Sequence, residues 1–235
     1  MPPDLSLVIP IYNEEKNIPT LWNEIREVMA RIPLSHEVIF VDDGSNDGSV
    51  KELKNLDGAV CIFSKRHRGK SSALSAGFQK SQGKIVLTLD GDLQDDPHEI
   101  PKFLQKINAG YDLVSGWKLH RKDPWTKTWP SRLFNQATSF FTGVKLHDFS
   151  SGFKAYRREV LPVLCLRRGL HRYLPLFAAA HGYHVGEIRY HHRPRRHGRS
   201  KYGISRLWEG PWGLILALWL TRKIIPIRKR SKETG

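Results

Sequence analysis

The chain has little cysteine and no apolar run long enough to cross a membrane. Its two cysteines, Cys61 and Cys165, lie in apolar contexts without metal-ligand spacing. We therefore expect both to be reduced core residues, which favours a cytosolic compartment and excludes a disulfide scaffold. The apolar stretch 212–220 is shorter than the roughly 20 residues that a spanning helix needs. Residues 1–4 lead directly into a strand-like run, without a secretory leader.

Acidic residues are scarce in the second half of the chain. Residues 1–112 hold 13 Lys+Arg and 17 Asp+Glu, whereas residues 113–235 hold 25 and 6. A half-chain this basic suits an anionic partner such as nucleic acid, acidic lipid or a phosphorylated substrate. A solvated basic surface is the plain alternative, and charge alone does not decide among them.

Short apolar runs alternate with helical patterns through the first half. Strands are predicted at residues 5–10, 36–41, 58–63, 84–89 and 112–115, and helices at 14–31, 69–82 and 97–108. This alternation predicts an α/β fold with a mostly parallel, doubly wound sheet flanked by helices. In such sheets ligands collect at the carboxyl ends of the strands.

The second half is less regular and ends in an apolar and basic tail. It predicts a helix at 130–141 and strands at 152–156 and 184–190. The tail, 208–235, joins an apolar, tryptophan-containing run to a basic flank, a pattern that suits a helix in the headgroup layer of an anionic membrane. A terminal helix docked on the core is the equal alternative.

Two carboxylates one residue apart follow the predicted strand 84–89, in Asp90-Gly91-Asp92-Leu93-Gln94. Such a pair forms a hard oxygen site that suits Mg²⁺ or Mn²⁺, with open positions for diphosphate oxygens. Gly91 allows close approach of a ligand to the backbone, and Gln94 can add a neutral oxygen. The alternative for this motif taken alone is an acidic turn that caps the helix beginning near Pro97, since Asp95 and Asp96 suit a helix N-terminus.

Further motifs accompany this pair in a fixed order. They are Pro10-x-Tyr-Asn-Glu, Val41-Asp-Asp-Gly-Ser-x-Asp-Gly, Asp90-Gly-Asp-Leu-Gln-Asp-x-Pro, Ser151-Gly-Phe-Lys-Ala-Tyr-Arg and Gly198-Arg-Ser-Lys-Tyr. Over about residues 5–201 the sequence resembles the family 2 glycosyltransferases, in the branch of dolichyl- and polyprenyl-phosphate sugar transferases. The resemblance implies a GT-A type, Rossmann-like nucleotide-diphospho-sugar transferase fold.

The resemblance also implies roles for individual residues. Those assigned to the nucleotide-sugar are Pro10, Tyr12, Glu14, Val41, Asp43, Asp90, Gly91, Asp92, Lys118, Arg195 and Lys201. Asp92 and Gln94 would hold Mg²⁺ or Mn²⁺, with Asp90 and Asp92 at the reacting diphosphate. Lys118 stands where the mannosyltransferases usually carry arginine; it keeps the charge but loses the planar fork.

The acceptor is expected to be a polyprenyl phosphate, gripped by Arg132, with inversion at the sugar implied by the family. An acceptor phosphate needs no deprotonation, whereas a glycan or small-molecule hydroxyl requires a general base. Asp148 is the candidate base, although we favour it as a structural member of the acceptor loop. The alternative of another class, a basic nucleic-acid-binding module around 189–201, leaves the acidic strand ends unexplained.

These assignments predict one catalytic domain over residues 1–207. Its nucleotide-sugar half spans 1–115 and its acceptor half spans 116–207, while 208–235 forms the tail. The expected partners are the nucleotide-sugar, the polyprenyl phosphate and the membrane surface, with no nucleic acid. We expect a cytoplasmic protein, peripheral at the inner face of the membrane, which can use a separate membrane protein as its partner.

Overall fold

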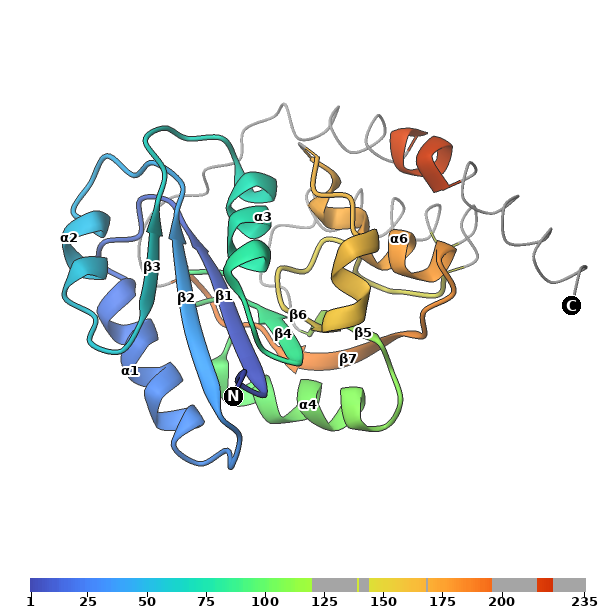
Figure 1. Cartoon of the computed structure of the whole chain (residues 1–235), viewed down its shortest axis with the longest axis horizontal. Coiled ribbons are helices and arrows are strands. Elements are labelled where there is room, and N and C mark those ends of the chain that lie inside the picture. The colour runs from blue at the N-terminus through green and yellow to red at the C-terminus, as the bar shows by residue number, and fades with distance from the viewer. Residues whose placement is uncertain (120–138, 140–143, 168, 196–214, 222–235) are drawn as a thin grey trace, which may run out of the picture.

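The computed structural model describes residues 1–119, 139, 144–167, 169–195 and 215–221 (Figure 1). The strands are β1 (Leu5–Ile11), β2 (His36–Asp42), β3 (Val60–Phe63), β4 (Ile85–Thr88), β5 (Leu113–Leu119), β6 (Lys154–Arg157) and β7 (Val185–His191). The helices are α1 (Ile18–Met29), α2 (Ser49–Lys54), α3 (Lys70–Lys80), α4 (Ile100–Asn108) and α6 (Leu174–Ala180). Short 3₁₀ turns cover Pro97–Glu99, Arg158–Val163 and Leu170–Tyr173.

All seven strands form one sheet in the order β3-β2-β1-β4-β6-β5-β7. β1 pairs in parallel with β2 and β4, β2 with β3, and β5 with β7. β6 runs antiparallel to both of its neighbours, β4 and β5. Among the described strands it is the one reversed member, so the prediction of a mostly parallel sheet is confirmed.

Helices cover both faces of the sheet, as the apolar strands require. Strand residues alternate between faces, so Leu7 of β1 belongs to the core cluster that includes residues of α1 and α4, while Val8 belongs to the cluster that includes residues of α3 and α6. Figure 1 shows α1 and α4 on one side of the sheet and α3 and α6 on the other. The result is the doubly wound, Rossmann-like architecture that the alternating pattern predicted.

Close packing on β1 depends on a glycine inside α3. A Cβ on Gly77 would lie 2.3 Å from Cγ1 of Val8, so only glycine lets this helix lie directly on the strand. The contact fixes where α3 begins, at Gly69 and Lys70, beside the carboxyl ends of β1 and β2.

Several boundaries differ from the sequence prediction. The first helix begins at Ile18 and not at residue 14, because the chain first turns at Asn13, which has a positive φ of 52°. Pro97 begins a 3₁₀ turn before α4, and the sequence did not predict α2 or α6. The predicted helix 130–141 lies outside the described residues, apart from Ser139, which is helical.

Residues 215–221 of the tail are helical, with one face packed on the core. Ala217 and Thr221 are buried, whereas Ile215, Leu216 and Trp219 are exposed. The rest of 208–235 is outside the described part of the chain. None of the described helices has both the length and the apolar character to cross a bilayer.

Candidate active site

The loop after β4 is anchored by a buried aspartate. The backbone N–H of Asp90 donates to Asp95 Oδ2 at 3.0 Å, and the Tyr190 hydroxyl donates to Asp95 Oδ1 at 2.6 Å. Burial opposes ionisation of Asp95, but His192 and Lys118 outweigh it and hold its pKa well below the usual value. Asp95 therefore ties the acidic loop to β7, and helix capping falls to Asp96, whose side chain accepts from the His98 N–H.

Two different segments meet at the Asp90 side chain. Lys70, at the start of α3, makes an ion pair with Asp90 Oδ1. A Cβ on Gly152 would lie 2.5 Å from both carboxylate oxygens, so the loop before β6 reaches Asp90 only because residue 152 has no side chain. Gly91 lies similarly close to β1, where its Cβ would meet Ile11 Cδ1 at 2.4 Å.

Oxygens of Asp92 and Gln94 converge on one point. Nη2 of Arg195 donates to Asp92 Oδ2 at 2.6 Å and to Gln94 Oε1 at 3.2 Å. A single cation can therefore contact both oxygens, next to the carboxylate of Asp90. Hard oxygen donors of this kind suit Mg²⁺ or Mn²⁺, and the residues present fit such an ion. Within the described part of the chain, no three His, Cys, Asp or Glu side chains form a group that could hold a metal ion by themselves. Water or phosphate oxygens can complete the coordination of such an ion.

The charge around Asp92 also favours a cation. Burial, followed by the negative charges of Asp90 and Asp95, raises the pKa of Asp92 to about 6. The ion pair with Arg195 lowers the pKa of Asp92 but does not cancel the combined effect of burial and the neighbouring negative charges. A divalent ion would relieve it, because it attracts all three carboxylates at once.

The carboxyl ends of β1 and β2 form the neighbouring part of the site. Asp43 is buried and accepts hydrogen bonds from the backbone N–H groups of Arg68, at 3.0 Å, and Gly69, at 2.7 Å. The ring of His67 stacks on Tyr12 with centroids 3.9 Å apart, and its Nδ1 lies 2.8 Å from Asp43 Oδ2. His67 was not predicted from the sequence, because the loop 64–69 matches none of the motifs and reaches Asp43 only through the pairing of β2 with β3.

The other predicted nucleotide residues lie around this end of the sheet. Pro10 and Val41 are register partners in β1 and β2, and Val41 is fully buried. Glu14 is buried next to α1, where its Oε2 accepts from the Asn17 amide at 2.5 Å, and its backbone N–H donates to Ser49. Lys118 lies on β5 opposite Tyr190 of β7.

The loop 147–153 is held by charges from two strands. Lys154 of β6 is buried and donates to the carbonyl oxygens of Phe149, at 3.3 Å, and Ser151. Burial lowers the pKa of Lys154 to about 7. From β7, Glu187 accepts the backbone N–H groups of His147 and Asp148.

Asp148 lies in this loop, which also reaches the carboxylate of Asp90 at Gly152. It is 2% exposed, and its Oδ1 accepts from the backbone N–H and the hydroxyl of Ser150 at 3.0 and 2.8 Å. The carboxylate thus stabilises its own loop. Of the remaining predicted residues, Arg132 and Lys201 lie outside the described residues, so their roles stay predictions.

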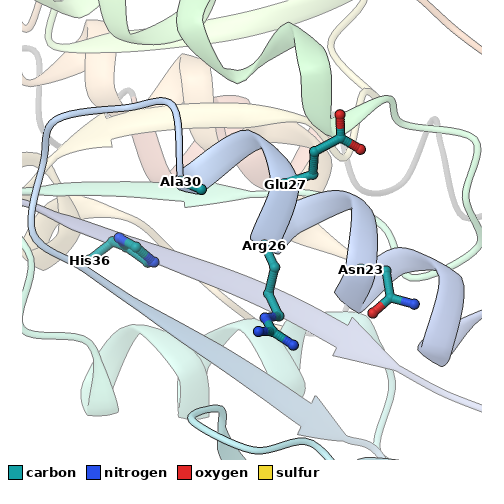
Figure 2. Close-up of a pocket in the computed structure, with 5 residues that line it drawn as sticks. All are labelled: Asn23, Arg26, Glu27, Ala30 and His36. Carbon is teal, nitrogen blue, oxygen red and sulfur yellow. The ribbon is translucent and has the colours of Figure 1, made fainter.

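A surface hollow of about 470 Å³ lies away from these residues. It is lined by Asn23, Arg26, Glu27, Ala30 and His36, from α1 and the start of β2 (Figure 2). It therefore opens toward the amino end of β2, whereas the carboxylates gather at the carboxyl ends of the strands. We do not associate it with the active site.

Comparison with known proteins gives consistent matches. Residues 6–164 match the model of the family described as Glycosyl transferase family 2. The undecaprenyl-phosphate 4-deoxy-4-formamido-L-arabinose transferase of Pseudomonas aeruginosa is 37% identical over 98% of this chain and 68% of its own length. The transferase of the same name from Aeromonas hydrophila is 32% identical over 92% of this chain and 68% of its own length.

Solved structures confirm the GT-A type fold. Glucosyl-3-phosphoglycerate synthase from Mycobacterium tuberculosis, in complex with Mg²⁺ and uridine diphosphate, aligns with a TM-score of 0.72 at 20% identity. The alignment covers 93% of this chain and 79% of the synthase. The same enzyme was also solved with Mn²⁺, uridine diphosphate and phosphoglyceric acid, again with a TM-score of 0.72. At this identity the likeness establishes the fold.

Because Asp92 is buried beside the negative charges of Asp90 and Asp95, we predict that Asp92→Asn stabilises the metal-free protein. The pKa of Asp92 is about 6 in the folded chain, above the ordinary value of an aspartate, so its ionisation costs stability as the pH rises from the ordinary value to about 6. In EDTA at pH 7.5, the variant should melt several degrees above the wild type. For a protein of this size, each kcal/mol of added unfolding free energy raises the melting temperature by about 2–4 °C. This gain should shrink below pH 4.

Thermal melting across pH 4–8 measures this difference. Asp57→Asn is the matched control, because Asp57 is exposed and lies away from Asp90, Asp92 and Asp95. A lower melting temperature for Asp92→Asn at pH 7.5 would mean that the ion pair with Arg195 outweighs the repulsion.

Proposed function

The chain belongs to glycosyl transferase family 2, and from this premise we propose that it transfers a sugar from a UDP- or GDP-linked donor to a polyprenyl phosphate, assisted by a divalent metal ion. The observation that carries the proposal is the convergence of Asp92 and Gln94 oxygens on one cation position beside Asp90. The relatives at 37% identity, named for an undecaprenyl-phosphate acceptor, support the lipid phosphate.

The proposed donor site lies mainly in the half 1–115 of the proposed catalytic domain, 1–207, and the half 116–207 adds basic residues to it. Pro10, Tyr12, Glu14, Val41 and Asp43 would line the nucleoside pocket at the ends of β1 and β2. Asp90 and Gly91 would meet the diphosphate, where Lys70 already places a cation. Arg195 would move from Asp92 to the diphosphate when the metal binds, and Lys118 and Lys201 would add positive charge.

Mg²⁺ or Mn²⁺ held by Asp92 and Gln94 would supply stabilisation of the negative charge that develops on the leaving diphosphate. The acceptor phosphate oxygen forms a bond to the anomeric carbon as the bond from that carbon to the diphosphate breaks. The bonding electron pair leaves with the nucleoside diphosphate, and no proton is removed. A single displacement of this kind inverts the anomeric centre.

The acceptor half, 116–207, brings positive charge to the attacking phosphate. Its basic composition lowers the cost of placing a second phosphate beside the donor diphosphate. Lys154 is buried behind the loop 147–153, and Arg132 is the proposed residue that grips the phosphate. Asp148 is buried and its Oδ1 is engaged by Ser150, which supports a phosphate acceptor over a hydroxyl acceptor.

The helix 215–221 would bring the enzyme to its lipid acceptor. Ile215, Leu216 and Trp219 form an exposed apolar face on a helix whose other face is packed on the core. We propose that this face enters the headgroup layer at the cytoplasmic side of the membrane. A separate membrane protein would be a further partner in this arrangement.

The donor and acceptor are identified by a direct assay. A panel of UDP- and GDP-sugars is incubated with polyprenyl phosphate and Mn²⁺, and a glycosylated lipid is expected by mass spectrometry. Asp92→Ala should abolish turnover with an unchanged circular dichroism spectrum, whereas Asp57→Ala should keep full activity. Full activity of Asp92→Ala would refute the metal assignment.

The class of acceptor is distinguished by Asp148→Asn. A phosphate acceptor predicts a partial loss of kcat, because the variant only loosens the loop. A hydroxyl acceptor predicts a loss of about 10²–10⁴-fold, which is what removing a general base costs. Ser150→Ala is the matched control, since it removes a hydrogen bond to Asp148 and should reproduce a partial loss if the role is structural.

Membrane binding is tested on the exposed face of the helix 215–221. The double variant Ile215→Ser and Trp219→Ser should sediment less with vesicles of anionic phospholipid, because both apolar side chains are exposed. Phe63→Ser is the control, as Phe63 is also exposed but lies on β3, at the far edge of the sheet. Equal sedimentation of the double variant and the wild type would contradict the membrane role.

A further inference from the structure

His67 combines two contacts that a nucleobase would make in this site. Its ring stacks on Tyr12 with centroids 3.9 Å apart and an interplanar angle of 25°. Its Nδ1 lies 2.8 Å from Asp43 Oδ2. Tyr12 and Asp43 are the side chains that the proposed function assigns to the nucleoside of the donor.

An imidazole and a nucleobase use such a pocket in the same way. Both are planar aromatic rings that stack on a tyrosine face, and both can present a ring N–H to a carboxylate. Base stacking on aromatic side chains tolerates different rings, because each has a π-face. We infer that the His67 ring occupies the nucleobase position in the nucleotide-free enzyme and that the donor displaces it. This inference rests on the proposed function.

The loop around His67 is held without its ring. Both oxygens of Asp43 accept backbone N–H groups, from Arg68 and Gly69. On the other side, Gly44 packs against the loop backbone, since its Cβ would lie 2.5 Å from the carbonyl carbon of Arg66. The backbone therefore stays anchored when the ring leaves.

The ring also has a path out of the pocket. The side chain of His67 is 50% exposed, whereas that of Asp43 is 4% exposed. Rotation of the His67 side chain toward solvent would uncover the face of Tyr12 and one oxygen of Asp43 while the pocket keeps its shape. His67 thus acts as a replaceable cover over preformed nucleoside contacts.

A ring that competes with the donor weakens the apparent affinity for nucleotide. The observed Kd is the intrinsic Kd divided by the fraction of molecules whose pocket is open. Removal of the ring should therefore tighten nucleotide binding, by about 2- to 10-fold if the stack contributes as aromatic pairs usually do. A ligand without a base does not meet the ring, so its affinity should stay unchanged.

The test compares His67→Ala with the wild type by calorimetry, with UDP, GDP and inorganic pyrophosphate as probes in the presence of Mn²⁺. The expected result is a 2- to 10-fold lower Kd for UDP or GDP and an unchanged Kd for pyrophosphate. His67→Asn, which also lacks the aromatic ring, should tighten nucleotide binding in the same direction. His36→Ala is the control, since His36 lies at the amino end of β2, in the surface hollow.

The possible failures are distinct. Unchanged or weaker nucleotide binding by both His67 variants, in a wild type that binds nucleotide, overturns the inference alone and leaves the donor site in place. A parallel change in pyrophosphate affinity also overturns it, because the effect would then not involve the base. No nucleotide binding by wild type and variants refutes the proposed donor site, and the inference with it.

Discussion

Repulsion among three aspartates at the end of β4 is the constraint around which this site is organised. Asp90, Asp92 and Asp95 lie within six residues, and the pKa of Asp92 is raised first by burial and then by the negative charges of Asp90 and Asp95. Each carboxylate is compensated by a residue from another part of the chain. Lys70 comes from α3, Arg195 follows β7, and His192 lies next to Asp95. The positive charge present does not fully compensate Asp92, and a divalent metal ion bound there would supply what is missing.

The sheet topology explains how these residues come together. Parallel pairing places the carboxyl ends of β1, β2 and β4 side by side, and the motifs follow those strands. The reversed strand β6 begins next to these carboxyl ends, so the loop before it reaches Asp90 at Gly152. One wall of the site thus serves both the proposed donor and the proposed acceptor.

The sequence predicted what depends on local pattern. The apolar runs of β1, β2 and β4 and the acidic turns after them are continuous segments, so their place at strand ends followed from periodicity. Contacts between distant segments were not predictable in this way. Asp95 suggested a helix cap, but it is buried against Tyr190, a residue far along the chain. Lys154 stood in a recognised motif, yet its burial depends on the reversed pairing of β6. His67 similarly depends on the pairing of β2 with β3.

The buried amino group of Lys154 limits how this loop can be re-engineered. It donates to main-chain oxygens of Phe149 and Ser151, whose positions depend on the course of the loop and not on its side chains. A graft from another transferase that altered this course would leave a buried amine without hydrogen-bond acceptors, which costs more than a lost surface contact. Loop and lysine therefore depend on each other, and a chimera has to exchange them together.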